Sequence, residues 1–116
     1  MALYRISREA RSDIIDILEH SQTRFGQAAR QRYQGLILAA LQELASTPDR
    51  LGSIPRDEIA PGLRSLHLFH CRGGSSIQRV QPPRHIVFYR VREDEVIEVV
   101  RLLHDAMEVR LRFPMQ

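Results

Sequence analysis

The chain has 116 residues, of which 43% are hydrophobic and 27% are charged, and this composition is typical of one globular domain rather than of a disordered or multidomain protein. Its single cysteine, Cys71, excludes an intramolecular disulfide and a cysteine-based zinc site, and it fits a reducing compartment such as the cytoplasm. The longest apolar run, at 36–41, is far shorter than the roughly 20 residues of a membrane helix, and the N-terminus has no apolar signal core. Neither a targeting segment nor a membrane-spanning segment is expected.

The positive charge of the chain is unevenly distributed. All 17 basic residues are arginines, and the formal net charge is +3. Residues 59–92 contain no acidic residue, whereas both flanking parts contain several. The arginines of this stretch are Arg64, Arg72, Arg79, Arg84, Arg90 and Arg92. Such a stretch favours an acidic partner, although a pair of solvated strands with arginines facing water would give the same pattern.

The first half of the chain has the pattern of a helical hairpin. Residues 3–6 alternate briefly like a short strand, and Ser7 then provides a helix N-cap. The apolar spacing predicts an amphipathic helix over residues 8–22. The Phe-Gly pair at 25–26 interrupts this pattern, and a second helix of about 20 residues follows until the Thr-Pro pair at 47–48. A break of about four residues between the helices predicts that they pack antiparallel.

The second half has the pattern of a β-sheet. Residues 48–62 are rich in proline and glycine and are predicted to be a surface connection. Three strand-like runs follow, at 63–70, 85–91 and 96–103, and residues 92–95 form the tight turn between the last two. The loop 71–84 is expected to be a long, flexible hairpin loop whose arginines project from its tip. Residues 104–116 are either an edge strand or a tail.

Together these elements predict a single α+β domain that spans residues 1–116. The order β-α-α-β-β-β, with the helices grouped early and the later strands joined by hairpins, places a helical hairpin on one face of a small antiparallel β-sheet. The other face is expected to stay open. An open face that carries arginines would be a docking surface for an acidic or flat partner.

Two histidine motifs suggest chemistry, but neither is compelling. His67 and His70 are three residues apart, so on a strand they would point to opposite faces and would not share a metal ion. His104 and Asp105 would pair as a base and its orienting acid, but adjacent strand side chains diverge, and no serine or cysteine nucleophile has a recognisable context. A metal site, a hydrolytic triad and a cofactor are therefore not expected.

The better candidate site is a set of basic residues on or beside predicted strands, where a sheet would hold them rigidly against phosphates. These residues are Arg64, Arg90, Arg101 and His104. A metal-independent ribonuclease needs arginines for the scissile phosphate and a histidine for proton transfer. Structural interpretations stay open: Arg101 would form an ion pair with Glu98 or Asp105, and His104 would be hydrogen-bonded at the strand end. Tyr89 is interpreted as core or sheet packing.

Six short motifs occur in a characteristic order along the chain. The most specific are the Phe88-Tyr89-Arg90 run and the Arg-Leu-Leu-His-Asp-Ala-Met run at 101–107. The others lie at 4–14, 25–26, 44–48 and 61–64. From about residue 4 to residue 110 the chain thus resembles the RelE/ParE family of toxins from type II toxin–antitoxin systems, and the ParE branch more closely.

The resemblance implies a small bacterial toxin that a cognate antitoxin, ParD-like or of a related kind, holds inactive in a hetero-oligomer. ParE-like toxins act on DNA gyrase, where they stabilise cleaved DNA and block replication. RelE-like toxins cut mRNA in the ribosome and use lysines, arginines and usually a late tyrosine or histidine. This chain has no lysine and no tyrosine after Tyr89. Gyrase is therefore the expected target, and ribosome-dependent mRNA cleavage by Arg64, Arg90 and His104 is the alternative.

This interpretation assigns two sets of binding residues. The residues expected to bind the target are Arg64, Arg90, Arg101, His104, Arg110 and Arg112. The residues expected to bind the antitoxin, along the helical hairpin and the sheet edge, are Ile14, Leu18, Tyr33 and Ile37. Their spacing suits an amphipathic partner helix, although an intramolecular core would use the same apolar stripes. Toxicity is expected to depend on the C-terminal segment 101–113.

Overall fold

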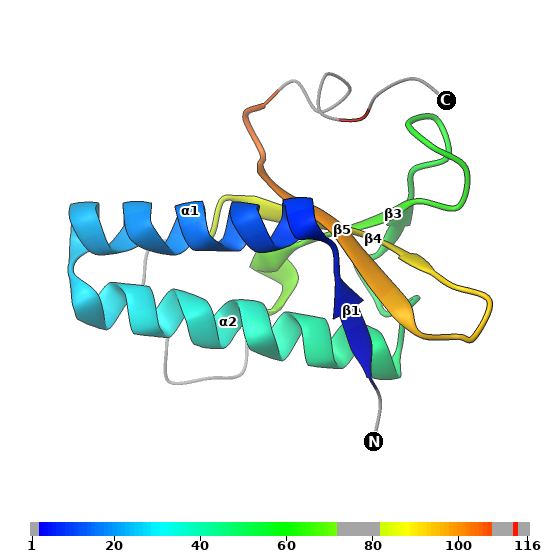
Figure 1. The fold of residues 1–116 in the computed structure, drawn as a ribbon, viewed down its shortest axis with the longest axis horizontal. Coiled ribbons are helices and arrows are strands. Elements are labelled where there is room, and N and C mark those ends of the chain that lie inside the picture. The colour runs from blue at the N-terminus through cyan, green and yellow to red at the C-terminus, as the bar shows by residue number, and fades with distance from the viewer. Residues whose placement is uncertain (1–2, 72–81, 108–112, 114–116) are drawn as a thin grey trace.

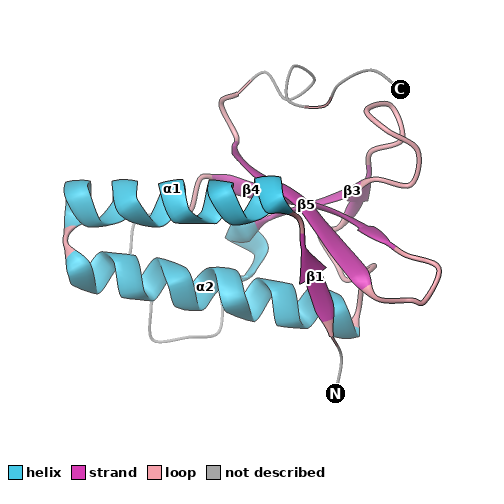
Figure 2. Ribbon diagram, viewed as in Figure 1, coloured by secondary structure: helices cyan, strands magenta, loops and turns pink. Residues whose placement is uncertain are grey.

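A computed structural model describes residues 3–71, 82–107 and 113, and it has the predicted α+β architecture, with two helices packed against one face of a β-sheet (Figures 1 and 2). In chain order the elements are β1 (Tyr4–Ile6), α1 (Arg8–Phe25), α2 (Gln27–Ser46), β2 (Ile54–Pro55), β3 (Arg64–His67), the 3-10 helix η1 (Leu68–Cys71), β4 (His85–Val91) and β5 (Ile97–His104). The long helices lie side by side and run in opposite directions, as the sequence predicts.

Two residues determine where the helices begin and end. The Ser7 hydroxyl accepts a hydrogen bond from the Ala10 N–H at 3.0 Å, which caps the N-terminus of α1. Gly26 has a φ of 95° and lies alone between the helices, so the chain reverses over one residue rather than the four expected. In the described part of the chain, neither helix is long and apolar enough to cross a membrane.

The sheet has five strands in the order β1-β5-β4-β3-β2, and it is mixed rather than wholly antiparallel. The exception is β1, which pairs parallel to the last strand, with Ile6 opposite Val99. Parallel neighbours require a crossover connection, and here the helical hairpin and three strands intervene between the two. The fifth strand is β2, which lies in the segment predicted to be irregular and places Ile54 opposite Ser65.

The strand predicted at 63–70 ends early, at His67, and continues as η1. The Phe69 N–H donates to Nδ1 of His67 at 3.0 Å, so a side chain rather than a neighbouring strand takes up this backbone donor. The chain therefore leaves the ladder three residues before the expected end of the strand.

Both faces of the sheet carry a hydrophobic core. The larger core lies beneath the helices and includes Tyr89, which is fully buried, as its interpretation as core packing requires. On the opposite face, Phe88 and Leu103 pack with Ala60 and Leu63 from the loop after β2. The Phe113 ring also lies on this face, 5.3 Å from the Phe88 ring. The expectation of an open face is therefore wrong in part, because a loop and an aromatic ring cover the middle of it.

Candidate functional site

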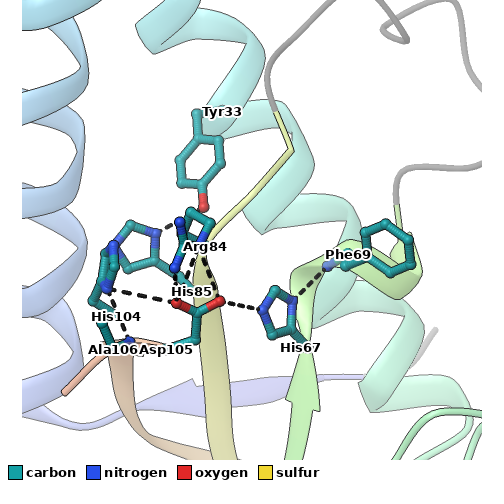
Figure 3. A network of polar contacts seen from close by, with 8 residues as sticks. All are labelled: Tyr33, His67, Phe69, Arg84, His85, His104, Asp105 and Ala106. Atoms are coloured by element: carbon teal, nitrogen blue, oxygen red, sulfur yellow. Dashed lines mark hydrogen bonds and ion pairs between the residues drawn. The ribbon is translucent and has the colours of Figure 1, made fainter.

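Polar side chains from four elements meet at one end of the sheet (Figure 3). The pairing of β4 with β5 sets His85 opposite His104, and the next pair continues the ladder, since the Asp105 N–H donates to the Arg84 carbonyl at 2.8 Å. His67 comes from the end of β3, and Tyr33 reaches the same place from α2. The full set is Tyr33, His67, Arg84, His85, His104 and Asp105.

Asp105 is the central acceptor of this network. One carboxylate oxygen accepts from Nε2 of His67 at 2.9 Å, and the other lies 2.9 Å from a terminal nitrogen of Arg84. The hydrogen bond from Arg84, with help from His67, lowers the pKa of Asp105 to about 2, against the opposing effect of burial. Asp105 is therefore ionised at neutral pH. Arg84, expected at the tip of the loop 71–84, instead lies at the end of the sheet beside this carboxylate.

Hydrogen bonds commit both ring nitrogens of His67. Its Nδ1 accepts from the Phe69 N–H at 3.0 Å, which leaves Nε2 protonated as the donor to Asp105. A histidine that donates to a carboxylate at one nitrogen and accepts from the backbone at the other has no nitrogen left for proton transfer. His67 therefore positions the C-terminal end of β5 rather than offering a base.

Tyr33 and His85 form a partly buried neutral pair. The Tyr33 hydroxyl lies 2.8 Å from Nδ1 of His85. Burial lowers the pKa of His85 to about 4, with a further contribution from His104, and burial raises the pKa of Tyr33 to about 12. Both groups are therefore uncharged at neutral pH, and a hydrogen bond joins the Tyr33 hydroxyl to Nδ1 of His85.

His104 offers one ring nitrogen to a ligand. Its Nδ1 accepts from the Ala106 N–H at 3.0 Å, and the nearest Asp105 oxygen lies farther away, at 3.6 Å. Asp105 is thus not the orienting acid of a His104 dyad, since it binds His67 and Arg84 instead. Nε2 of His104 has no hydrogen-bond partner among the residues that the structure describes.

Two of the predicted arginines are bound within the protein. Nε of Arg64 donates to the Ser53 hydroxyl at 2.9 Å, and Ser53 in turn bonds the Tyr89 hydroxyl. This chain of hydrogen bonds ties the loop after α2 to the sheet. Arg101 forms the ion pair that its structural interpretation predicts, but the partner is Asp13 of α1, at 2.8 Å, rather than Glu98 or Asp105.

The four basic residues of the predicted phosphate site do not converge on one point. Arg64 lies opposite Tyr89 of β4, and His104 lies opposite His85 of the same strand. Arg64 and His104 are therefore four residues apart along β4, which is roughly 13 Å at 3.3 Å per residue. Arg90 lies one residue farther along β4, and strand alternation places it on the face opposite the helices. Arg72, Arg79, Arg110 and Arg112 lie outside the described residues.

Comparison with known proteins identifies the family. The model of the family "ParE toxin of type II toxin-antitoxin system, parDE" matches residues 4–109. The chain belongs to this family. Toxin ParE1 of Caulobacter vibrioides is 32% identical over 110 residues, which cover 95% of this chain and 96% of that protein. Toxin ParE1 of Mycobacterium tuberculosis is 32% identical over 111 residues, covering 91% and 92% of the two chains. The resemblance predicted from the sequence motifs is confirmed.

A solved structure agrees with the fold of this ParE-family chain. "Chromosomal ParDE TA system from P. aeruginosa" superposes with a TM-score of 0.66 over 90% of this chain and 96% of that chain. At 17% sequence identity, this likeness shows the shared fold alone.

The residues predicted to bind the antitoxin differ in accessibility. Leu18 and Ile37 are 5% and 1% exposed, so both belong to the intramolecular core, which was the alternative interpretation of these apolar stripes. Ile14 and Tyr33 pack at the edge of that core and remain partly exposed. The hairpin also carries exposed apolar residues that its amphipathic stripes do not indicate, because two of them lie beside the stripes and the third lies at the break between the helices. They are Ile15, Phe25 and Leu38, with exposures of 50%, 51% and 43%.

Proposed function

We propose that this ParE-family toxin poisons DNA gyrase in the cytoplasm, stabilises cleaved DNA and thereby blocks replication until a cognate antitoxin binds it directly. Gyrase is the target that the resemblance to the ParE branch implies. The main observation in support of this proposal is that the candidate catalytic residues do not lie together. Arg64, Arg90 and His104 are at different places on the sheet.

A ribonuclease requires a closer arrangement. A general base has to come within about 3 Å of the proton it removes, and the groups that stabilise the transition state have to reach the same phosphate. Among the described residues, Arg64 is instead bonded to Ser53 and lies roughly 13 Å from His104 along the sheet. Binding that traps the cleaved-DNA intermediate of another enzyme requires only a complementary surface.

Neutralisation is proposed to use the helical hairpin. An amphipathic segment of the antitoxin would dock with apolar side chains at helical spacing. Ile14 and Tyr33 keep accessible area for such a contact, and Ile15 and Leu38 add two large apolar side chains that no intramolecular partner covers fully. The complex is then a hetero-oligomer whose formation removes apolar surface from water.

The test compares two reactions of the purified full-length chain. Incubation with gyrase, ATP and supercoiled plasmid should accumulate cleaved plasmid in a gyrase-dependent manner, and addition of the antitoxin should abolish this effect. The same preparation should leave mRNA on translating ribosomes intact. Ribosome-dependent mRNA cleavage with no effect on gyrase would replace the proposal with the RelE-like alternative.

A further inference from the structure

We propose that Arg90 binds one backbone phosphate of DNA on the sheet face opposite the helices. This inference deepens the proposed function, on which the choice of DNA as the ligand rests. It assigns to the toxin a direct contact with the nucleic acid in addition to any contact with the target enzyme.

The first observation is a hydrogen-bond donor without an acceptor. Arg90 lies in β4 between the buried Tyr89 and the exposed Val91. Its Nε is buried and has no hydrogen-bond partner among the residues that the structure describes. A buried N–H without an acceptor loses its bonds to water and gains nothing in return, so such groups are rare in folded proteins. An oxyanion that drew the Arg90 side chain outward would supply the missing acceptor.

The second observation is that the nearby acids are already bound to other arginines. Glu98 lies directly across the sheet from Arg90, but its carboxylate accepts from Arg92 at 2.9 Å. Glu58 accepts from Nε of Arg56 at 2.7 Å. Each of these two carboxylates is therefore already paired with another arginine.

The third observation concerns the apolar residues on the same face of the sheet as Arg90. Phe88, two residues earlier on the same face, is fully buried, and the Arg56 guanidinium lies over its ring at 5.7 Å. Leu63 packs with Phe88 and adds to this apolar floor. Charge-assisted hydrogen bonds are stronger above such a floor than in bulk water, because the local dielectric constant is lower.

The chemistry of guanidinium selects the ligand. Nε and one terminal nitrogen of an arginine form a planar fork that matches two oxygens of a phosphate or a carboxylate. We assign phosphate because residues 59–92 contain six arginines and no acid, which favours a polyanion, and because the proposed target holds DNA. A carboxylate ligand is left as an outcome of the test.

The test measures binding of the full-length chain to a short fluorescein-labelled DNA duplex by fluorescence anisotropy over a range of NaCl concentrations. Arg90→Gln should weaken binding about tenfold at low salt and reduce the slope of log K against log [salt] by about 1. Arg90→Lys should restore the slope but not the full affinity, because lysine keeps the charge and lacks the fork. Arg32→Gln, an exposed position on α2, is the matched control and should change affinity less than about twofold.

Thermal unfolding of each variant separates folding from binding. Arg90→Gln should melt at or above the wild-type temperature, since it removes a buried donor that lacks an acceptor. If Arg90→Gln fails to fold, the difference in duplex affinity between Arg90→Lys and the wild type decides instead. Both proteins carry the positive charge at this position, but only the wild type has the planar guanidinium fork. Equal affinity of these two proteins would then overturn the proposal.

Three further outcomes would overturn it. Equal losses for Arg90→Gln and Arg32→Gln would show general electrostatic attraction without a site. Displacement of the duplex from Arg90 by polyglutamate at equal charge concentration would identify a carboxylate ligand. Poisoning of gyrase by a wild-type toxin that binds no DNA would remove this inference and leave the proposed function standing. Conversely, Arg90-dependent DNA binding by a toxin without effect on gyrase would support the site and remove the proposed function.

Discussion

The carboxylate of Asp13 on α1 binds the guanidinium of Arg101 on β5 through two hydrogen bonds, of 2.8 and 2.9 Å, although the residues are 88 positions apart. The same carboxylate accepts from the Leu102 N–H at 3.0 Å. These bonds lie just beyond the three-residue strand β1, where no other described strand pairs with the outer edge of β5. Asp13 thus attaches α1 to the sheet and occupies a backbone donor that would otherwise be open to a foreign strand.

We expect Asp13→Ala to lower the free energy of unfolding by about 2–3 kcal/mol, because a largely buried ion pair loses its acceptor. The side chains of Asp13 and Arg101 are only 13% and 22% exposed, so water does not replace the lost bonds well. Urea unfolding measures the change. The exposed Arg5–Asp94 pair is the control, and Asp94→Ala should cost clearly less than Asp13→Ala. Equal costs for the two substitutions would contradict this role of Asp13.

Stability should fall as the pH drops from about 6.5 toward 4, because of His85. Its pKa in the folded protein is about 4, below the ordinary value of 6.5, so between these values the unfolded chain binds a proton that the folded protein does not. The loss approaches about 3 kcal/mol near pH 4 and is absent above pH 7. Asp105 acts in a separate, more acidic window, since its pKa of about 2 affects stability only below its unfolded value of 3.8.

Urea unfolding at several pH values tests this prediction. His85→Asn should lower stability at neutral pH and flatten its dependence on pH between 6.5 and 4. His20→Asn, at an exposed position of α1, should change that dependence only slightly, since His20 is the smallest contributor to the lowered pKa of His85. A wild-type protein with constant stability over this range would show that the partly buried pair of Tyr33 and His85 accepts a proton without cost.

His104 discriminates between the two candidate activities. If the toxin were a ribonuclease that used Nε2 of His104 for proton transfer, His104→Gln would reduce activity by about 10²–10⁴-fold. We expect a gyrase poison to tolerate the substitution with a loss of about tenfold or less, since interface energy is spread over several contacts. Plasmid cleavage by gyrase measures the effect, and antitoxin binding serves as the folding control. A steep, isolated loss together with RNA cleavage would favour the ribonuclease.

The C-terminal segment is expected to carry part of the toxicity. Removal of the chain beyond Met107, or neutralisation of Arg110 and Arg112, should abolish growth arrest while antitoxin binding persists, because arginines are common anchors of interfaces. Truncation also removes the ring of Phe113 from Phe88, so Phe113→Ala is the control. That substitution should cost about 1 kcal/mol of stability and leave toxicity intact. Full toxicity of the truncated chain would disprove the prediction.

Exposed and buried positions of the helical hairpin should respond differently to charge. Ile15→Glu and Leu38→Glu should weaken antitoxin binding at least about tenfold without unfolding the toxin, because both side chains are about half exposed. Ile37→Glu should unfold the protein, because Ile37 is 1% exposed. Circular dichroism and calorimetry with the antitoxin distinguish these results. Unchanged affinity of the first two variants would place the antitoxin elsewhere.

The local features of this chain could be predicted from its sequence. The apolar spacing and the Ser7 cap predicted the helices, and runs of β-branched residues predicted β4 and β5 within about a residue of their observed bounds. These signals act over a few residues, through backbone hydrogen bonds and through one face of each element. The order of the short motifs was also sufficient to identify the family, because this order can be compared without knowing which elements are in contact.

Long-range pairing was decided only by the tertiary structure. The sequence around β1 does not indicate that this strand lies parallel to β5. The number of residues between His67 and His85 likewise does not indicate which residues of β3 and β4 lie opposite each other. The partner of Arg101 was misjudged for the same reason, since Asp13 lies 88 residues away whereas Glu98 is a near neighbour in sequence. Such contacts form because the whole core brings the elements together, and no local preference of the chain specifies them.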